Sequence, residues 1–208
     1  IIIFNLRGEK LKLKILKFIH IFLLFCLIFS NITIFASSLS NDKLYCTNNL
    51  IMDFESGNVL FEKNGYEKVY PASTTKILTA ILALENLDIN NSIVVSNNAI
   101  DSTPIGSSVM KLQKEEVISI KNVLYGLLLV SGNDAANVIA ESVSGNIDDF
   151  INLMNEKLKE IGCYSTHFTN AHGFHDDNHY STAYDMALIM KYAMQNETFR
   201  QIIETKEY

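Results

Sequence analysis

The chain has 208 residues, of which 48% are hydrophobic and 19% are charged, and its formal net charge is −6. These values suit one globular domain of ordinary size together with an additional apolar segment. Residues 1–36 carry five positive charges and one negative charge, so the remainder carries a net charge of −10. A surface this acidic argues against nucleic acid as a partner.

The apolar segment lies at the front of the chain. Five basic residues precede the apolar run Phe18 to Phe29, and Ala36 offers a small residue before Ser37. This is the layout of a secretory signal peptide. We therefore expect residues 1–36 to be a signal peptide and the rest to be exported, to the cell wall or the outer face of the cytoplasmic membrane. An uncleaved membrane anchor is the alternative, because apolar character recurs through Phe35.

Strands are predicted first along the exported part, and helices follow. Two apolar runs flank Glu55-Ser56-Gly57 and predict a β-hairpin, and one buried helix comes after it. The hairpin strands cover residues 50–54 and 58–62, the helix ends near 87, further strand candidates cover 93–95 and 107–112, and helices are predicted over 120–130, 134–142, 148–161 and 182–195. This order favours an α+β fold with a helical lobe.

A candidate nucleophile opens the first buried helix. Pro71 ends an extended segment, and Ser73 or Thr74 can cap the first turn of the helix. Lys76 lies one turn later on the same face, so its amine can reach the Ser73 hydroxyl. A desolvated amine can act as the base that a serine nucleophile needs, and the pair requires no histidine.

The Ser-x-x-Lys pattern occurs three times in this chain, so the surrounding sequence must show which occurrence is the catalytic candidate. Ser40 and Lys43 fall in a polar stretch after the targeting segment. Ser108 and Lys111 fall in an alternating run, where positions three apart point to opposite faces of a strand. Only the pair at residues 73 and 76 opens a buried helix.

A second polar motif, Ser131-Gly132-Asn133, lies between two predicted helices. The same triplet at residues 56–58 and 144–146 reads as a hairpin turn and a helix exit. Ser131, by contrast, is held between a strongly apolar helix and an alanine-rich one, so we expect it to face a cleft. A plain helix-helix connection capped by Asn133 or Asp134 is the alternative.

Together these stretches resemble the serine D-alanyl-D-alanine carboxypeptidases, the low-molecular-mass penicillin-binding proteins. The resemblance runs from Leu44 to Tyr208. It rests on Pro-Ala-Ser-Thr-Thr-Lys at 71–76, Tyr-Gly-Leu-Leu at 125–128, Ser-Gly-Asn-Asp-Ala-Ala at 131–136 and Thr-His-Phe-Thr-Asn-Ala-His-Gly-Phe at 166–174. It implies a β-lactamase/DD-peptidase-like fold, in which an antiparallel sheet packs on helices beside a helical lobe, with residues 37–208 as the catalytic domain.

The same resemblance implies roles for four residues. Ser73 would be the nucleophile and Lys76 its base, Ser131 would relay a proton to the leaving amine, and Asn133 would bind the substrate's peptide backbone. The implied partners are peptidoglycan stem peptides ending in D-Ala-D-Ala, with β-lactams as covalent inhibitors. No Cys/His spacing indicates a zinc site and no glycine-rich loop indicates phosphate binding, so no cofactor is expected.

One departure from the family is large. Its third motif, Lys-Thr-Gly on a sheet-edge strand, does not occur in these 208 residues, so we expect the chain to be truncated at its C-terminus. The strand would supply an oxyanion donor and the cation for the substrate's carboxylate, and a membrane anchor would follow it. Because loss of one oxyanion donor typically costs about 100- to 1000-fold in rate, residues 37–208 alone should be a poor enzyme.

Two other functions remain open from the sequence. A serine β-lactamase needs a placed base for fast deacylation, but residues 165–173 offer His167 and His172 and no carboxylate. An inert wall-binding or membrane-tethered fragment is the alternative from another class. His172 is expected to be structural, because a Ser-Lys pair already has its base. Cys46 and Cys163 can form a disulfide or remain free thiols.

Overall fold

The computed structural model describes residues 17–19 and 45–208, and its chain divides into two compact units, residues 1–43 and 44–208. Of the predicted signal peptide, only the short exposed helical stretch Lys17–Ile19 is described, so that prediction lies otherwise outside the described residues. Within the described parts of the chain, no helix is both long and apolar enough to cross a membrane.

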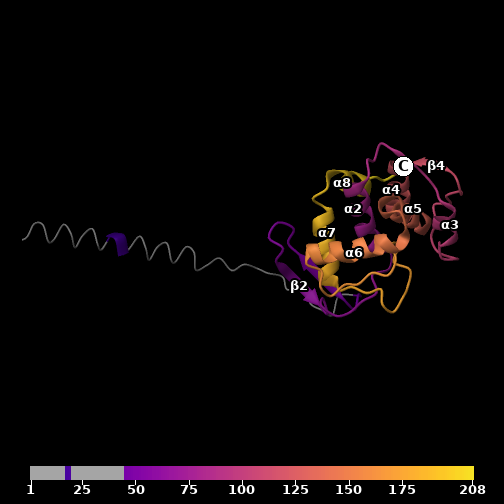
Figure 1. Cartoon of the computed structure of the whole chain (residues 1–208). Helices are drawn as coiled ribbons and strands as arrows, with labels where there is room; N and C mark the ends of the chain where they lie inside the picture. The colour runs from indigo at the N-terminus through magenta and orange to yellow at the C-terminus, as the bar shows by residue number, and fades with distance from the viewer. Residues whose placement is uncertain (1–16, 20–44) are drawn as a thin grey trace, which may run out of the picture. The chain divides into compact units, whose positions relative to one another are not determined.

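The second unit combines helices with two small sheets (Figure 1). In chain order its elements are β1 (Asn49–Met52), β2 (Val59–Lys63), the 3₁₀ turn η2 (Ala72–Thr75), α2 (Lys76–Asn86), β3 (Ser92–Val94), α3 (Asn97–Asp101), β4 (Val117–Ser119), α4 (Ile120–Leu129), α5 (Asn133–Ser144), α6 (Ile147–Ile161), α7 (Ala183–Ala193) and α8 (Glu197–Ile203).

The predicted hairpin is confirmed. Strands β1 and β2 pair antiparallel, with Asn49 opposite Lys63. The Asp53 carboxylate accepts hydrogen bonds from the backbone and hydroxyl of Ser56, and Gly57 takes a positive φ of 76°. Gly57 therefore supplies turn chemistry that the sequence indicated, whereas Asp53 was expected within the first strand and lies in the turn instead.

The second sheet corrects one prediction. Strand β3 lies where residues 93–95 were expected to be extended, but its antiparallel partner is β4, with Ser92 opposite Ser119. The expected strand over 107–112 is absent from the structure. Lys111 has a φ of 69°, and this left-handed residue breaks the alternation that the sequence suggested.

The helix boundaries follow local capping residues. Ser119 accepts a hydrogen bond from Asn122 N at the start of α4, and Thr182 accepts one from Asp185 N at the start of α7. Helix α6 ends at Gly162, whose φ is 95°. Helix α8 was not predicted, because it is only seven residues long.

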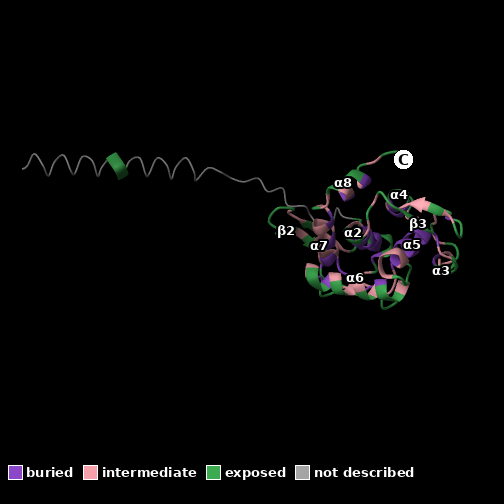
Figure 2. Ribbon diagram, turned by 45° about the horizontal axis from the view of Figure 1, so that its top comes forward, coloured by how far each residue is buried: buried purple, intermediate pink, exposed green. Residues whose placement is uncertain are grey.

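Helix α2 forms the centre of the core. It packs against α4, α5, α6, α7 and α8 (Figure 1). Most of its residues are buried, because its sequence is apolar on all sides. Figure 2 shows buried residues gathered in the middle of this unit and many exposed residues along α6. Lys76, at the first position of α2, and Ser73, on the turn just before it, therefore stand at the start of a well-packed helix.

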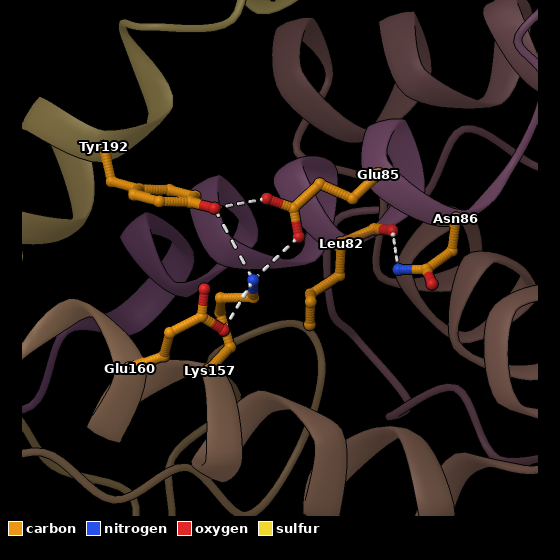
Figure 3. A network of polar contacts seen from close by, with 6 residues as sticks. All are labelled: Leu82, Glu85, Asn86, Lys157, Glu160 and Tyr192. Carbon is orange, nitrogen blue, oxygen red and sulfur yellow. Dashed lines mark hydrogen bonds and ion pairs between the residues drawn. The ribbon is translucent and has the colours of Figure 1, made fainter.

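The far end of α2 is held by a polar network (Figure 3). Lys157 of α6 places its amine 3.1 Å from Glu85 and 2.9 Å from Glu160, and the Tyr192 hydroxyl of α7 donates to Glu85 at 2.6 Å. Burial alone would lower the pKa of Lys157, but the hydrogen bonds to Glu160 and Glu85 outweigh it and raise that pKa. The network joins α2, α6 and α7 at the end opposite the candidate site.

Candidate active site

Ser73 lies on a tight turn before the helix. It is exposed on η2, and α2 begins only at Lys76. The expected cap by Ser73 or Thr74 is therefore wrong: Thr75 precedes α2 without a side-chain cap, and the Thr74 hydroxyl donates backward to Pro71 O at 2.6 Å. Because the chain enters as a 3₁₀ turn, Ser73 faces outward while the helix behind it is buried.

Lys76 is buried, with 2% of its surface exposed, and it has three hydrogen-bond acceptors. Its Nζ lies 2.7 Å from Asn133 Oδ1, 2.7 Å from the carbonyl oxygen of His172 and 3.3 Å from Ser73 Oγ. The first two acceptors cannot donate and so fix two N–H groups. The third tetrahedral position of the amine points to the Ser73 hydroxyl.

The environment shifts Lys76 towards its neutral form. Burial lowers its pKa to about 8, and the charge of Asp134 opposes part of this effect. At pH 7 roughly one molecule in ten then carries the neutral amine. With two N–H groups held by the Asn133 and His172 oxygens, the lone pair of that amine faces Ser73 Oγ, which is the arrangement that accepts a proton from a serine nucleophile.

The second motif occupies the short connection between α4 and α5. Ser131 has a left-handed φ of 62°. Its hydroxyl oxygen is buried and has no hydrogen-bond partner among the residues that the structure describes. A buried unpaired hydroxyl is costly, so it is a natural contact for a bound molecule. Asn133 starts α5, is 5% exposed and presents its oxygen to Lys76.

Asp134 fixes the neighbouring backbone. Its carboxylate accepts hydrogen bonds from Met110 N at 2.9 Å and Leu112 N at 3.0 Å, and Asn133 N donates to Ser108 O at 2.8 Å. These bonds replace the strand pairing expected for 107–112. The segment 108–112 is thus tied to the start of α5, beside the second motif.

A cleft of about 420 Å³ brings the two motifs together. Ser73, Lys76 and Ser131 all line it. Its other walls are mostly apolar and come from Thr74, Ile77, Leu127, Leu128, Leu129, Met190, Phe199 and Ile203. Asn133 does not line the cleft, but its side chain reaches the site through Lys76.

The segment Thr169–His179 packs against Lys76 and the serine turn. His172 contributes its carbonyl oxygen to Lys76, and its ring Nδ1 accepts from Phe174 N at 3.1 Å. Burial, with help from the charge of Lys76, lowers the pKa of His172 to about 4, so the ring is neutral at pH 7. Gly173 has a φ of 84°, and a Cβ there would lie 1.8 Å from Ala72 O. Only glycine fits this contact with the serine turn.

Sequence reasoning missed three contributors to the site. Asp134 had a visible signal, a charge directly after Ser-Gly-Asn at the start of a buried helix. His179, whose Nε2 lies 2.8 Å from the hydroxyl of Thr75 in the serine turn, was visible only as a histidine in a polar segment. The carbonyl of His172 has no signal, since every residue carries one.

The remaining sequence candidates lie elsewhere. Ser108 contributes a backbone oxygen rather than its side chain, and Ser40 with Lys43 lies outside the described residues. Cys46 is exposed and Cys163 is buried, and both are free thiols, so they do not form a disulfide with each other. Burial raises the pKa of Cys163 to about 12.

A serine hydroxyl beside a partly neutral, buried amine defines a site suited to acyl transfer through a serine nucleophile. The family model described as D-alanyl-D-alanine carboxypeptidase (peptidase family S11) matches residues 36–208. The chain belongs to this family.

Individual relatives and solved structures support the same family assignment. The chain is 36% identical over 163 residues to the D-alanyl-D-alanine carboxypeptidase DacF of Bacillus subtilis, covering 76% of this chain and 41% of the relative. Among solved structures, the D-alanyl-D-alanine carboxypeptidase DacD of Francisella tularensis superposes with a TM-score of 0.74 at 35% identity, over 80% of this chain and 41% of that one. Penicillin-binding protein 5 of Haemophilus influenzae gives a TM-score of 0.76 at 29% identity, over 82% and 51%.

These superpositions confirm the predicted fold class, a DD-peptidase-like α+β fold. The chain spans about two fifths of the length of the curated relative from Bacillus subtilis.

Proposed function

We propose that the full-length protein is a serine D-Ala-D-Ala carboxypeptidase, which removes the terminal D-alanine from peptidoglycan stem peptides through an acyl-enzyme on Ser73. One observation carries the proposal. In a chain of this family, the exposed hydroxyl of Ser73 lies 3.3 Å from the buried amine of Lys76, at the wall of a cleft.

The first half-reaction acylates the serine. Neutral Lys76 takes the hydroxyl proton as Ser73 Oγ forms a bond to the carbonyl carbon of the penultimate D-alanine. The tetrahedral intermediate then collapses, and the peptide C–N bond breaks. The departing amine gains a proton and leaves as free D-alanine.

Ser131 and Asn133 serve this step in different ways. Ser131 has a buried hydroxyl without a partner in the described structure, and this hydroxyl passes the proton from Lys76 to the departing amine. Asn133 uses its oxygen to orient Lys76, which leaves its amide N–H groups to donate to the substrate's backbone carbonyl.

The second half-reaction frees the serine. Water attacks the acyl carbon, Lys76 accepts a proton from that water, and the bond from the carbonyl carbon to Ser73 Oγ breaks. The serine recovers its proton, and the shortened peptide leaves as a carboxylic acid. A β-lactam presents a similar carbonyl and carboxylate, so it would acylate the same serine and inhibit the enzyme.

A β-lactamase is less well supported. Fast hydrolysis of the penicillin adduct needs a placed base for water, and no carboxylate is among the residues lining this cleft in the described structure. The family match points the same way, since its description names a carboxypeptidase.

The experiment is mass spectrometry of the full-length protein after incubation with benzylpenicillin. We expect a stable adduct on Ser73 that Ser73→Ala abolishes, and release of D-alanine from diacetyl-Lys-D-Ala-D-Ala. Rapid turnover of a chromogenic β-lactam would support the lactamase instead. An adduct on Ser108, or no acylation at all, would overturn the assignment.

Export completes the proposal, because the substrate lies outside the cytoplasm. Residues 1–36 would be removed as a signal peptide, and a segment C-terminal to Tyr208 could associate the protein with the membrane. The native protein should therefore begin near Ser37. Detection of the run Phe18 to Phe29 in the mature protein would show that this segment is retained, as expected for a membrane anchor and not for a signal peptide.

A further inference from the structure

The turn that carries Ser73 is strained, and its backbone hydrogen bonds are local. Ala72 has a left-handed φ of 48°, and α2 starts without a side-chain cap. Thr74 N donates to Pro71 O at 3.2 Å, Lys76 N donates to Ser73 O, and the Thr74 hydroxyl also binds Pro71 O. Because these bonds stay within the turn, the strained conformation needs further partners elsewhere if Ser73 Oγ is to keep a fixed place beside the amine of Lys76.

One side-chain hydrogen bond joins η2 to a distant part of the described chain. The hydroxyl of Thr75, which lies between Ser73 and Lys76 in sequence, is 2.8 Å from His179 Nε2. Both residues are buried, with Thr75 at 0% and His179 at 2% exposure. In water-free surroundings a bond of this kind is expensive to break, because it leaves two polar groups without partners.

The surroundings of His179 define its protonation. Thr169 N donates to His179 Nδ1 at 3.0 Å, so Nδ1 carries no proton. The proton is therefore on Nε2, which donates to the Thr75 hydroxyl. The ring stacks on Phe168 with centroids 4.7 Å apart and planes inclined by 6°. Its position is thus fixed on both nitrogens and on one face.

Two neighbouring hydrogen bonds hold the segment Thr169–His179 against α2. The Thr79 hydroxyl donates to Ala171 O at 2.6 Å, and Lys76 donates to His172 O. These bonds attach α2 itself, at its first residue, Lys76, and one turn further on, at Thr79. The bond from His179 is the one that reaches the serine turn.

We infer that His179 is a positioning residue of the proposed acyl-transfer site: its Nε2–H group holds Thr75 and thereby fixes the turn that presents Ser73 to Lys76. The inference rests on the proposed function. It assigns His179 no contact with substrate, and it differs from His172, whose carbonyl binds Lys76 directly.

The test separates acylation from binding in the full-length protein. Thr75→Val keeps the shape of the side chain but removes the hydroxyl, and His179→Phe keeps a stacking ring but removes the donor. Each should lower the rate constant of Ser73 acylation by benzylpenicillin by about tenfold or more, with little change in the Kd of the preceding complex, because misplacement of the nucleophile affects chemistry. Thr75→Ser should stay near the wild-type rate. The double variant Thr75→Val/His179→Phe should be no slower than the slower single variant, since both remove one bond.

Asn137→Ala is the matched control. Asn137 is buried on α5 and donates to Ala99 O at 3.1 Å, away from the serine turn. It should lower the Tm but leave acylation at the wild-type rate. The inference fails if Thr75→Val is acylated as fast as the wild type, if Asn137→Ala slows acylation equally, or if the two single losses multiply in the double variant. A wild-type protein that benzylpenicillin does not acylate would overturn the proposed function and this inference with it, whereas an acylated wild type with equally fast variants overturns this inference alone.

Discussion

As the proposed base, Lys76 must be buried and must also be held in place. Burial removes water from the amine, and the oxygens of Asn133 and His172 supply two hydrogen bonds in its stead. Both acceptors are neutral groups, so they orient the amine without the full stabilisation of its charge that an adjacent carboxylate would give. This explains how one side chain can be fully hydrogen-bonded and still have a pKa of about 8.

Acylation should therefore depend on pH through Lys76. The neutral amine is the reactive form, so the acylation rate should rise about tenfold per pH unit up to pH 8 and level off above it. His172 and His179 have pKa values of about 4 and stay neutral throughout this range. Stopped-flow acylation by a chromogenic β-lactam between pH 6 and 9.5 measures the profile.

Lys76→Arg is the control for this profile. Arginine retains the positive charge but cannot deprotonate in this range, so acylation should fall by about 100-fold or more and lose its dependence on pH. A midpoint near 6.5 in the wild type would indicate a histidine base, and a flat profile would rule out Lys76 as the group that titrates.

At the scale of elements, the contact between the serine turn and the segment Thr169–His179 depends on close backbone packing. Gly173→Ala places a methyl group 1.8 Å from Ala72 O at a φ of 84°, so backbone must move. We expect a loss of at least about 3 kcal/mol in the free energy of unfolding, together with slower acylation, because the turn shifts with its neighbour. Urea unfolding and the acylation assay measure the two effects.

Gly145→Ala provides the comparison. Gly145 has nearly the same φ, 81°, but a Cβ there would meet nothing within 4 Å. It should cost roughly 1 kcal/mol, the strain of a left-handed alanine, and leave acylation unchanged. Equal losses in the two variants would show that backbone strain, and not the contact with Ala72, sets the cost.

The elements that sequence predicted well are those whose signals are local. Ser119, Thr182 and Gly162 mark helix ends by their own side chains or φ angles, and the hairpin carries its turn residues between its strands. The segment 107–112 failed because its backbone bonds a carboxylate, Asp134, more than twenty residues away. Alternation of residue types cannot reveal such a partner.

The contacts of the candidate site also divide into local ones, which the sequence predicts, and long-range ones, which it does not. Ser73 and Lys76 are three residues apart, so a helical turn predicts their proximity directly. Asn133 was assigned to substrate from the family resemblance, and its bond to Lys76 depends on how α5 packs against α2. The contacts of His172 and His179 depend on a loop about a hundred residues further along, and no periodicity predicts where a loop will dock.

On the scale of the whole molecule, the site joins three separate segments: the serine turn, the α4–α5 connection and Thr169–His179. The third segment carries two buried neutral histidines. His172 faces Lys76 and His179, and His179 faces His167 and Asp176 as well. Burial is the main cause that lowers both pKa values to about 4. In mild acid the unfolded chain therefore binds a proton on each of these two histidines, whereas the folded chain keeps both rings neutral.

Stability should fall in mild acid for this reason. Each histidine has a pKa of about 4 when folded and an ordinary value near 6.5 when unfolded, so between these values the unfolded chain binds more protons. The stabilisation is complete above pH 6.5 and is lost as the pH falls towards 4. We expect the free energy of unfolding to drop by an amount on the order of a few kcal/mol between pH 7 and pH 5, a range in which most carboxylates remain ionised.

Urea unfolding at intervals across this range measures the slope. His179→Phe removes one of the two groups and should roughly halve the slope, whatever its effect at pH 7. His175→Gln is the control, because His175 is exposed, and it should leave the slope unchanged. A free energy of unfolding that stays constant from pH 7 to pH 5 would mean that the fold does not hold these two rings neutral. The tautomer assigned to His179 would then be wrong, because it assumes a neutral ring.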